Sequence, residues 1–225
     1  MKFDLAEYPT VNPSRHLPSH YASAGRFERW TNQVIAAFLL VMLSPVFLVV
    51  AVLTWQIDGA PIFFGHYRVG FRGRVFRCLK FRTMYRNSSA MLAEILATDP
   101  VARAEWTRDQ KLSVDPRVTP IGRFLRKSSL DELPQLLNVL YGEMNLVGPR
   151  PVVVEELTRY GGVRWDYLAV RPGITGLWQV SGRNLVSYEQ RVVLDQRYVE
   201  KRSFLFDVSI LLRTVKVLVT REGAS

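Results

Sequence analysis

The sequence contains little cysteine and histidine. Cys78 is the only cysteine, and the three histidines, His16, His20 and His66, show no spacing typical of metal ligands. A single cysteine excludes an intramolecular disulfide and any zinc site built from several cysteines. This usage is compatible with a globular part located in the reducing cytosol.

Acidic residues are scarce relative to basic ones. The chain of 225 residues has 30 Lys and Arg against 20 Asp and Glu, a formal net charge of +10 and a pI of about 10.0. Such an excess indicates anionic partners: membrane headgroups, phosphorylated substrates or nucleic acid. Since no nucleic-acid-binding motif is recognisable, nucleic acid is not expected. The hydrophobic fraction of 48% excludes a disordered chain.

From Val34 to Trp55 the sequence carries no charge, and only Ser44 and Thr54 are polar. A helix of roughly 20 residues crosses the hydrocarbon core of a bilayer, so this run is long enough. It is too long, and begins too far into the chain, for a signal peptide. Pro45 is expected to break the helix at Ser44-Pro45, with the Ser44 hydroxyl compensating a freed backbone carbonyl.

Basic residues lie on both sides of this run. Arg26 and Arg29 precede it, and a series that begins at Arg68 follows it. The positive-inside rule places both flanks in the cytoplasm. We therefore expect a re-entrant helix that turns at Ser44-Pro45 and leaves by the face it entered. A proline-kinked single span is the alternative.

The fold class predicted from the remaining pattern is α+β, mainly helical with a small β element. Residues 1–25 are interpreted as a flexible tail, 26–57 as the membrane helix and 58–225 as a cytosolic domain. The spacing of apolar residues and the positions of turn-forming residues predict further helices, strands and turns. These are strands at 62–67 and 74–81, helices at 89–111, around Phe124 and from Leu130 to a stop at Gly142, a non-helical strip at 149–151, and turns at Gly173, Gly176 and Gly182.

Residues 204–219 are predicted to form a basic amphipathic helix. Its apolar stripe consists of Phe204, Val208, Leu211, Leu212, Val215 and Val219. The pattern suits a helix that lies in the headgroup layer of a membrane. An ordinary surface helix that turns the stripe toward a core fits the same pattern.

Two adjacent carboxylates, Asp131 and Glu132, give the strongest chemical signal. Because Pro134 prefers the first turn of a helix, the pair is expected near a helix N-terminus, where anions are favoured. Successive helical residues point about 100° apart, which favours separate roles as nucleophile and Mg²⁺ ligand. The alternative is a capping box formed by Ser129 and Glu132. The basic residues nearby that could neutralise a diphosphate are Arg117, Arg123, Arg126 and Lys127.

Several motifs occur in one order along the chain. They are Lys80-Phe81-Arg82-Thr83-Met84, Asp115-Pro116-Arg117-Val118-Thr119, Ser128-Ser129-Leu130-Asp131-Glu132-Leu133-Pro134-Gln135, Val147-Gly148-Pro149-Arg150-Pro151 and Arg171-Pro172-Gly173-Ile174-Thr175-Gly176. In these motifs the chain resembles the bacterial sugar transferases, the monotopic polyprenyl-phosphate phosphoglycosyltransferases. The resemblance extends over residues 26–220.

The resemblance implies a role for each motif. Asp131 is expected to attack the β-phosphorus of a UDP-sugar and release UMP, after which undecaprenyl phosphate removes the phosphosugar. Glu132 is expected to hold Mg²⁺ and Arg126 to contact phosphate. Pro149-Arg150-Pro151 is expected beside the nucleotide, and Ser44-Pro45 at the break of a re-entrant helix. Substrate or phosphate binding is also assigned to Lys80, Arg82 and Arg117.

His66, Cys78-Leu79-Lys80-Phe81-Arg82 and Gly176-Leu177-Trp178-Gln179 resemble the branch that handles galactose- or glucose-1-phosphate in exopolysaccharide synthesis. The expected location is the bacterial inner membrane, with the catalytic domain facing the cytoplasm and membrane lipids as partners. Larger relatives carry an N-terminal multi-span region, so this chain resembles the short form. Asn32 stands where the family has aspartate. The sugar and the oligomeric state, including a homodimer, stay open.

A second hypothesis is a non-catalytic membrane-surface module that binds anionic lipids through its basic face. Composition and the amphipathic stretch support both hypotheses equally. The acidic pair and Pro149-Arg150-Pro151 favour the enzyme.

Overall fold

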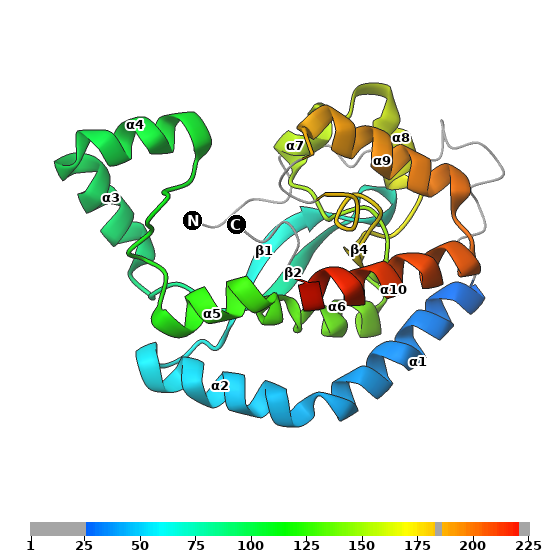
Figure 1. The fold of residues 1–225 in the computed structure, drawn as a ribbon, viewed down its shortest axis with the longest axis horizontal. Helices are drawn as coiled ribbons and strands as arrows, with labels where there is room; N and C mark the ends of the chain where they lie inside the picture. Colours follow the sequence, from blue (N-terminus) through cyan, green and yellow to red (C-terminus); the bar gives the residue numbers. More distant parts are fainter. Residues whose placement is uncertain (1–25, 183–185, 221–225) are drawn as a thin grey trace. The chain divides into compact units, whose positions relative to one another are not determined.

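The computed structural model describes residues 26–182 and 186–220 (Figure 1). The predicted tail, residues 1–25, lies outside the described residues. Over these residues the fold is mainly helical with a small β component, as predicted, and the β component consists of two separate two-stranded sheets. The chain forms two compact units from non-contiguous segments. The smaller unit comprises residues 44–64 and 80–133, and the larger unit comprises residues 26–43, 65–79, 134–182 and 186–220. The functional boundaries expected at residues 25 and 57 stay predictions.

The smaller unit consists of four helices and a 3₁₀ turn. They are α2 (Ser44–Asp58), α3 (Ser88–Thr98), α4 (Pro100–Asp109), α5 (Pro120–Ser128) and η5 (Leu130–Glu132). The core of this unit is formed by Val50, Phe81 and Leu125. The ring of Phe81 lies 5.4 Å from the ring of Phe47 and 5.3 Å from that of Phe63. Segment 80–83 is thereby anchored to α2 by apolar packing.

The single helix predicted over 89–111 is wrong, because the chain breaks at Asp99-Pro100 into α3 and α4, which pack side by side (Figure 1). The Asp99 side chain accepts hydrogen bonds from the backbone N–H groups of Val101 and Ala102, and Pro100 starts the new helix. An aspartate N-cap followed by proline is a helix-start signal. In residues 89–111 this start signal overrides the apolar periodicity that predicted one continuous helix.

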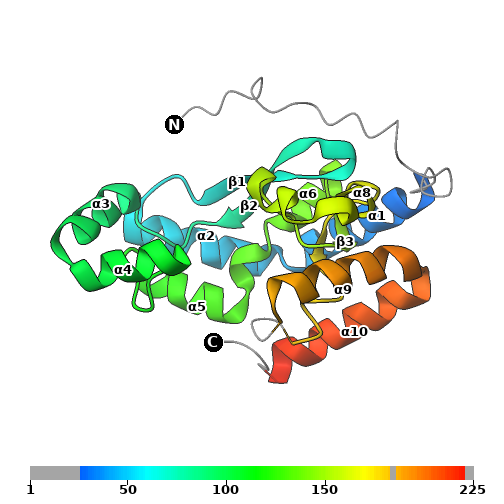
Figure 2. The same ribbon diagram turned by 90° about the horizontal axis from the view of Figure 1, so that it is seen from above.

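The larger unit contains most of the remaining elements. They are α1 (Arg26–Met42), α6 (Gln135–Tyr141), β3 (Asn145–Val147), α7 (Val154–Thr158), η6 (Gly161–Val163), α8 (Arg164–Leu168), β4 (Gly173–Thr175), α9 (Tyr188–Lys201) and α10 (Phe204–Thr220). Helix α10 follows α9 after a short turn (Figure 2), and the rings of Tyr198 and Phe206 are stacked with their centres 6.1 Å apart. Gly142, at φ 77°, ends α6 as predicted.

Strands β3 and β4 pair in parallel, with Asn145 opposite Gly173 and Val147 opposite Thr175. The predicted turn at Gly173 is therefore wrong, because Gly173 is the first residue of β4. A Cβ at Gly173 would lie 2.1 Å from the backbone nitrogen of Gly148, so glycine permits the close approach of the two backbones. Hairpin strands β1 (Phe63–Val69) and β2 (Val75–Phe81), connected through η4 (Phe71–Gly73), confirm the two strands predicted from sequence.

Among the described helices, none is by itself long and apolar enough to cross a membrane. Helices α1 and α2 meet the requirement of length and composition only as a pair, bent by 64° at their break. The break expected at Ser44-Pro45 falls at Leu43, one residue earlier, because Ser44 begins α2 and Pro45 lies in its first turn. Proline is tolerated there because the N–H groups of a first turn have no intrahelical partner. The role predicted for the Ser44 hydroxyl stays a prediction.

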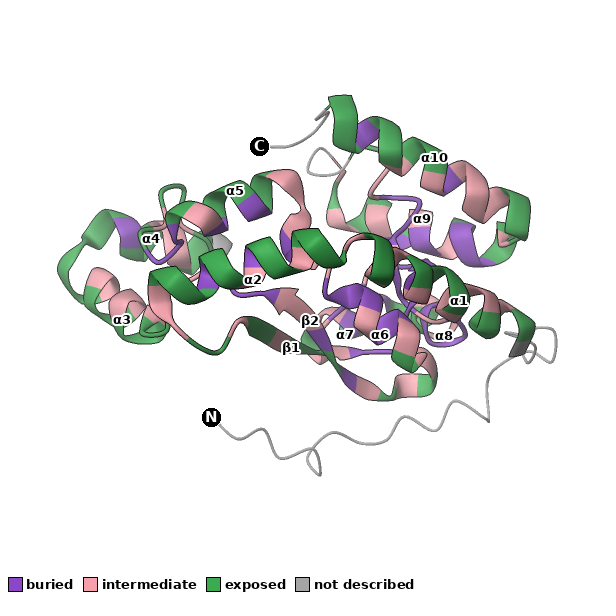
Figure 3. Cartoon of the chain, turned by 90° about the horizontal axis from the view of Figure 1, so that it is seen from below, coloured by how far each residue is buried: buried purple, intermediate pink, exposed green. Residues whose placement is uncertain are grey.

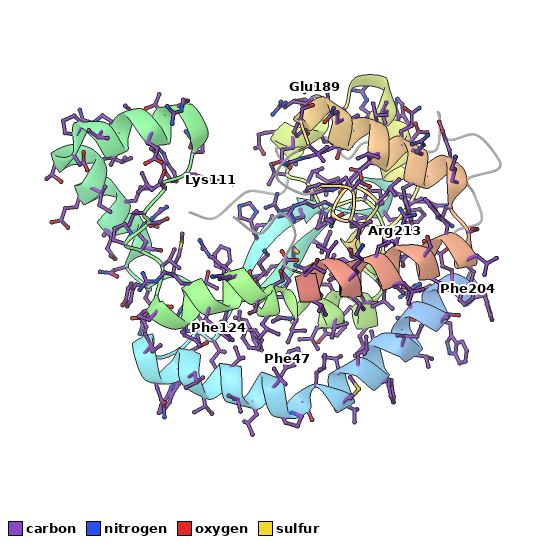
Figure 4. All side chains as sticks on the ribbon, viewed as in Figure 1. Phe47, Lys111, Phe124, Glu189, Phe204 and Arg213 are labelled. Carbon is purple, nitrogen blue, oxygen red and sulfur yellow. The ribbon has the colours of Figure 1, made fainter. Side chains whose placement is uncertain are left out.

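Helices α1, α2 and α10 each expose apolar side chains. The exposed residues of these helices are green in Figure 3. Leu48 in α2 is 66% exposed, and Val219 in α10 is 76% exposed. Phe204, labelled in Figure 4 with Arg213 on the same helix, is 72% exposed. The core side of α10 is formed instead by Ile210 and Val217. Most of the predicted apolar stripe of α10 therefore faces away from the core.

Asn32, the departure from the family pattern, is fully engaged in the larger unit. Its Oδ1 accepts a hydrogen bond of 2.8 Å from the backbone nitrogen of Leu146, and its Nδ2 donates to the backbone oxygen of Glu28 at 2.9 Å. The Glu28 carboxylate accepts from Asn145 at 2.7 Å and from Arg202 at 2.8 Å. An aspartate could supply the same acceptor oxygen, but only the amide also donates to Glu28.

Candidate active site

The carboxylate pair lies in the 3₁₀ turn η5, which directly follows α5. Ser129 joins the two elements in the left-handed conformation, at φ 59° and ψ 14°. This turn precedes α6 along the chain, so the expectation of a position next to a helix start holds in sequence order. Ser129 makes no side-chain capping hydrogen bond to η5, so the capping-box alternative is wrong.

Lys80 is the counter-ion of the pair. Its Nζ lies 2.7 Å from Glu132 Oε1 and 3.4 Å from Asp131 Oδ2. The side chains are 32% exposed for Lys80, 10% for Asp131 and 24% for Glu132. A group at the end of β2 thus compensates two carboxylates that would otherwise repel each other in a partly desolvated environment.

The pKa of the Asp131 carboxyl is raised above its ordinary value. Burial is the largest cause, because it disfavours the charged form. The Lys80 ammonium opposes this shift, the charge of Glu132 adds to it, and the Arg126 guanidinium lowers the pKa slightly. The sequence attributed the ionised state of Asp131 to a helix dipole. In the structure, the groups that favour this ionised state are the nearby cations Lys80 and Arg126.

Arg126 is held beside the pair by segment 80–83. Its Nε donates to Thr83 Oγ1 at 2.9 Å, while the residue as a whole remains exposed. Helix α5 can approach Thr83 because residue 122 is glycine, where a Cβ would lie 2.1 Å from the Thr83 backbone oxygen. Segment 80–83 thus supplies the Lys80 ammonium and, through Thr83, orients the Arg126 guanidinium. Two cationic groups therefore lie near the carboxylates.

Arg82 and Arg117, also predicted to bind phosphate, are buried and engaged within the protein. Arg82 Nη2 donates to the backbone oxygens of Asp58 and Gly59 at 3.1 and 2.7 Å, and lies 3.3 Å from the Asp58 carboxylate. Arg117 forms a bidentate pair with Asp115 at 2.8 and 2.7 Å. This geometry gives both arginines a structural role, at the end of α2 and before α5. Their predicted contact with phosphate stays a prediction.

Pro149-Arg150-Pro151 follows β3 in the larger unit and is non-helical, as predicted. The Arg150 guanidinium carbon lies 5.9 Å from the centre of the Trp178 ring. Asp195, which no sequence motif singles out, is 2% exposed and accepts a hydrogen bond of 2.8 Å from Tyr160. Its only signal in the sequence is an acidic residue four positions after Arg191, and this spacing is common on solvated helices.

His66 is exposed in β1, with its Nδ1 3.0 Å from the backbone oxygen of Tyr67. The substrate contact weighed for it stays a prediction. Cys78 is buried in the core of the larger unit.

No group of three or more His, Cys, Asp or Glu side chains suited to a metal occurs within residues 26–182 and 186–220. Asp131 and Glu132 remain as a pair of carboxylates. Mg²⁺ commonly takes one or two protein carboxylates and completes its shell with water and substrate phosphate oxygens. The donor set therefore fits a magnesium ion that binds together with a phosphorylated substrate.

Residues 23–221 match the family described as bacterial sugar transferase. The chain belongs to this family.

Curated relatives include a "UDP-galactose-lipid carrier transferase" from Erwinia amylovora, 51% identical over 219 residues, or 97% of this chain and 45% of the relative. An "Undecaprenyl-phosphate galactose phosphotransferase" from Salmonella typhimurium is 48% identical over 201 residues, 89% of this chain and 42% of the relative. An "Exopolysaccharide production protein ExoY" from Sinorhizobium fredii is 49% identical over 200 residues, 89% of this chain and 88% of the relative. The chain thus spans less than half of the first two relatives and most of the third.

Proposed function

We propose that this protein transfers hexose-1-phosphate from a UDP-sugar to undecaprenyl phosphate and releases UMP, as the first membrane step of exopolysaccharide synthesis. The observation that carries the proposal is the pair Asp131 and Glu132, with Lys80 Nζ 3.4 Å from Asp131 and 2.7 Å from Glu132, in a chain of the bacterial sugar transferase family. The names of the Erwinia and Salmonella relatives support galactose as the sugar. Glucose is the other candidate.

The reaction proceeds in two displacements at one phosphorus atom. A carboxylate oxygen of Asp131 bonds to the β-phosphorus of the UDP-sugar, and the bond from that phosphorus to the bridging oxygen breaks as UMP leaves with the electron pair. A phosphate oxygen of undecaprenyl phosphate then attacks the same phosphorus and expels the Asp131 carboxylate. Covalent catalysis of this kind divides a difficult transfer between two bulky phosphates into two simpler steps.

The side chains around Asp131 suit this chemistry. Burial raises the pKa of Asp131 and so strengthens the carboxylate as a nucleophile, while Lys80 favours its ionised form. Arg126, oriented by Thr83, offers donors to a phosphate oxygen. Glu132 and the substrate phosphates would hold Mg²⁺, which supplies neutralisation of the charge that develops on the phosphate oxygens.

Membrane attachment is part of the proposal. The exposed apolar side chains on α1 and α10 of the larger unit, and those on α2 of the smaller unit, are what hydrocarbon and headgroups would cover. The attachment expected is monotopic, with the catalytic residues on the cytoplasmic side of the inner membrane, where a UDP-sugar and the lipid phosphate can meet.

The test is an assay of UMP release by the membrane-bound protein with UDP-galactose or UDP-glucose, Mg²⁺ and undecaprenyl phosphate. Release is expected with one of the two donors, and it is expected to stop with EDTA or Asp131→Asn. Glu94→Gln, which alters an exposed carboxylate of α3 in the same unit, is the matched control and should retain full activity. Mass spectrometry of the protein with donor alone should find a phosphosugar on residue 131.

Full UMP release by the Asp131→Asn variant would exclude the covalent mechanism. If the wild-type protein binds anionic vesicles yet releases no UMP with any UDP-sugar, the non-catalytic membrane-surface module becomes the better account.

A further inference from the structure

Two arginines from different elements meet at one indole ring in the larger unit. The guanidinium carbon of Arg191, in α9, lies 4.5 Å from the centre of the Trp178 ring, and that of Arg150 lies 5.9 Å from it. Trp178 is only 6% exposed, whereas both arginines are partly exposed. Since little of the indole remains accessible, a ligand here would meet two guanidinium groups and little aromatic surface.

A buried carboxyl lies close to these cations. Asp195 follows Arg191 by one helical turn on α9, the helix whose first turn carries Glu189 (Figure 4). Asp195 Oδ2 accepts a hydrogen bond of 2.8 Å from Tyr160. Among the described residues, neither Asp195 Oδ1 nor the buried Arg191 Nε has a hydrogen-bond partner. A buried polar atom without a hydrogen-bond partner lowers the stability of the folded protein. Such atoms are retained more often at functional sites than elsewhere.

The electrostatics connect Asp195 to both arginines. Burial raises the pKa of the Asp195 carboxyl to about 7, while the Tyr160 hydrogen bond and the charges of Arg150 and Arg191 lower it. The phenols of Tyr167 and Tyr188 also interact with the Asp195 charge. Near neutral pH, therefore, the carboxyl is close to half-ionised, and its charge offsets that of one arginine only when it has lost its proton.

We propose that Arg191 joins Arg150 in binding the phosphate of a substrate over Trp178, and that the Tyr160–Asp195 pair regulates the charge of this two-arginine site. The identity of the ligand rests on the proposed function. Two guanidinium groups provide paired, charge-assisted donors to phosphate oxygens. The phosphate could belong to the nucleotide donor or to the lipid acceptor, and the chemistry of recognition is the same for both.

Binding is measured in an Asp131→Asn background, which retains the ligand without turnover. The probes are UDP-glucose and farnesyl phosphate at pH 8, studied by calorimetry on the full chain in detergent. Arg191→Gln is expected to weaken binding of one probe by about tenfold, because a charge-assisted hydrogen bond is lost. Loss for UDP-glucose assigns the site to the donor, and loss for farnesyl phosphate assigns it to the acceptor.

Arg159→Gln is the matched control. Arg159 also lies over an aromatic ring, 3.6 Å from the centre of Tyr188, but it is largely exposed and its nearest carboxylate, Glu189, is 4.0 Å away. This variant should bind both probes as the parent does. Equal binding by Arg191→Gln, Arg159→Gln and the parent would overturn the proposal.

The regulatory part is tested with UDP-glucose, whose diphosphate does not titrate between pH 6 and 8. Affinity for this probe, or for farnesyl phosphate corrected for its own titration, should rise roughly threefold to tenfold as pH falls from 8 to 6. Asp195→Asn should show the high affinity at both pH values. Tyr160→Phe, which removes a hydrogen bond that lowers the Asp195 pKa, should move the midpoint to higher pH. Identical pH profiles for these variants and the parent would refute charge regulation.

These outcomes are separable from those of the proposed function. Turnover by the wild-type protein together with unchanged binding by Arg191→Gln would reject the two-arginine site and leave the transferase intact. Weakened phosphate binding by Arg191→Gln in a protein that never releases UMP would support the two-arginine site and reject the transferase.

Discussion

The two compact units each contain a buried aspartate, and each environment treats its carboxyl differently. Asp131 in the smaller unit is 7% exposed, and Asp195 in the larger unit is 2% exposed. Burial raises the pKa of both carboxyls. Asp131 has the Lys80 ammonium 3.4 Å away, whereas Asp195 has a neutral phenol at 2.8 Å. A full charge opposes desolvation more strongly than a neutral hydrogen bond does.

The two carboxyl environments suit two different functions. A nucleophile must be ionised when the substrate arrives, and a nearby cation favours that state. A carboxyl that regulates the charge of a binding site must change its protonation near working pH, and a phenol in a desolvated position leaves the pKa at about 7. Four predictions test this comparison.

The largest effect is expected when the proposed nucleophile, Asp131, is replaced. Asp131→Asn should lower the rate of UMP release by about 10³-fold or more, because an amide is a poor nucleophile and the covalent route is lost. Steady-state assays should show the loss in kcat with little change in thermal stability. The isosteric change Glu94→Gln on α3 should leave the rate unchanged.

Removal of the counter-ion should have the second largest effect. Lys80→Met leaves two carboxylates facing each other, and it should reduce stability by about 1–2 kcal/mol and the rate by roughly tenfold or more. Chemical unfolding and the UMP assay measure the two effects. Lys111→Met removes an exposed lysine of the same unit, between α4 and α5, and is the control. If both variants lose the same amount of activity, Lys80 is only one of many surface charges.

The third prediction concerns stability of the larger unit as a function of pH. The pKa of Asp195 is raised from 3.8 to about 7 in the folded protein, so its stabilising contribution is complete below about pH 4 and is lost as pH rises through 7. Asp195→Asn should remove this loss. Relative to wild type, the variant should gain about 2–3 kcal/mol between pH 5 and pH 8, because pH 5 lies two units below the folded pKa and each unit corresponds to about 1.4 kcal/mol.

Urea unfolding at the two pH values measures this gain. Glu189→Gln changes an exposed carboxylate of the same helix, and its effect should be similar at pH 5 and pH 8. A parallel pH dependence of wild type and Asp195→Asn would show that the carboxyl does not titrate in this range.

The features that could be predicted from the sequence are local ones. Pro45, Gly142 and the alternating residues of the β1–β2 hairpin each act within a few positions, and the structure places a break, a helix end and two strands there. The carboxylate pair is also a local signal. Its counter-ion is not, because Lys80 lies 51 residues before Asp131.

Contacts between distant segments account for what was missed. The parallel pairing of β3 with β4 joins Asn145 to Gly173, and neither three-residue strand has a periodicity of its own. The hydrogen bond from Tyr160 to Asp195 spans 35 residues, and burial alone makes that carboxyl unusual. Arg82 and Arg117 look like free cations in sequence, but Asp58 and Asp115 engage them in the folded protein.

The smallest effect concerns how each unit ends a helix. The larger unit ends α6 with Gly142 at φ 77°, whereas the smaller unit ends α5 with Ser129 at φ 59°, two residues before Asp131. A non-glycine residue in this left-handed conformation costs on the order of 1 kcal/mol. Ser129→Gly should therefore stabilise the protein by about 0.5 kcal/mol after the added entropy of the unfolded chain, and Ser129→Val should destabilise it by about 1–2 kcal/mol. Thermal unfolding of both variants measures the difference, and a valine variant as stable as the glycine variant would show that the turn before Asp131 holds no backbone strain.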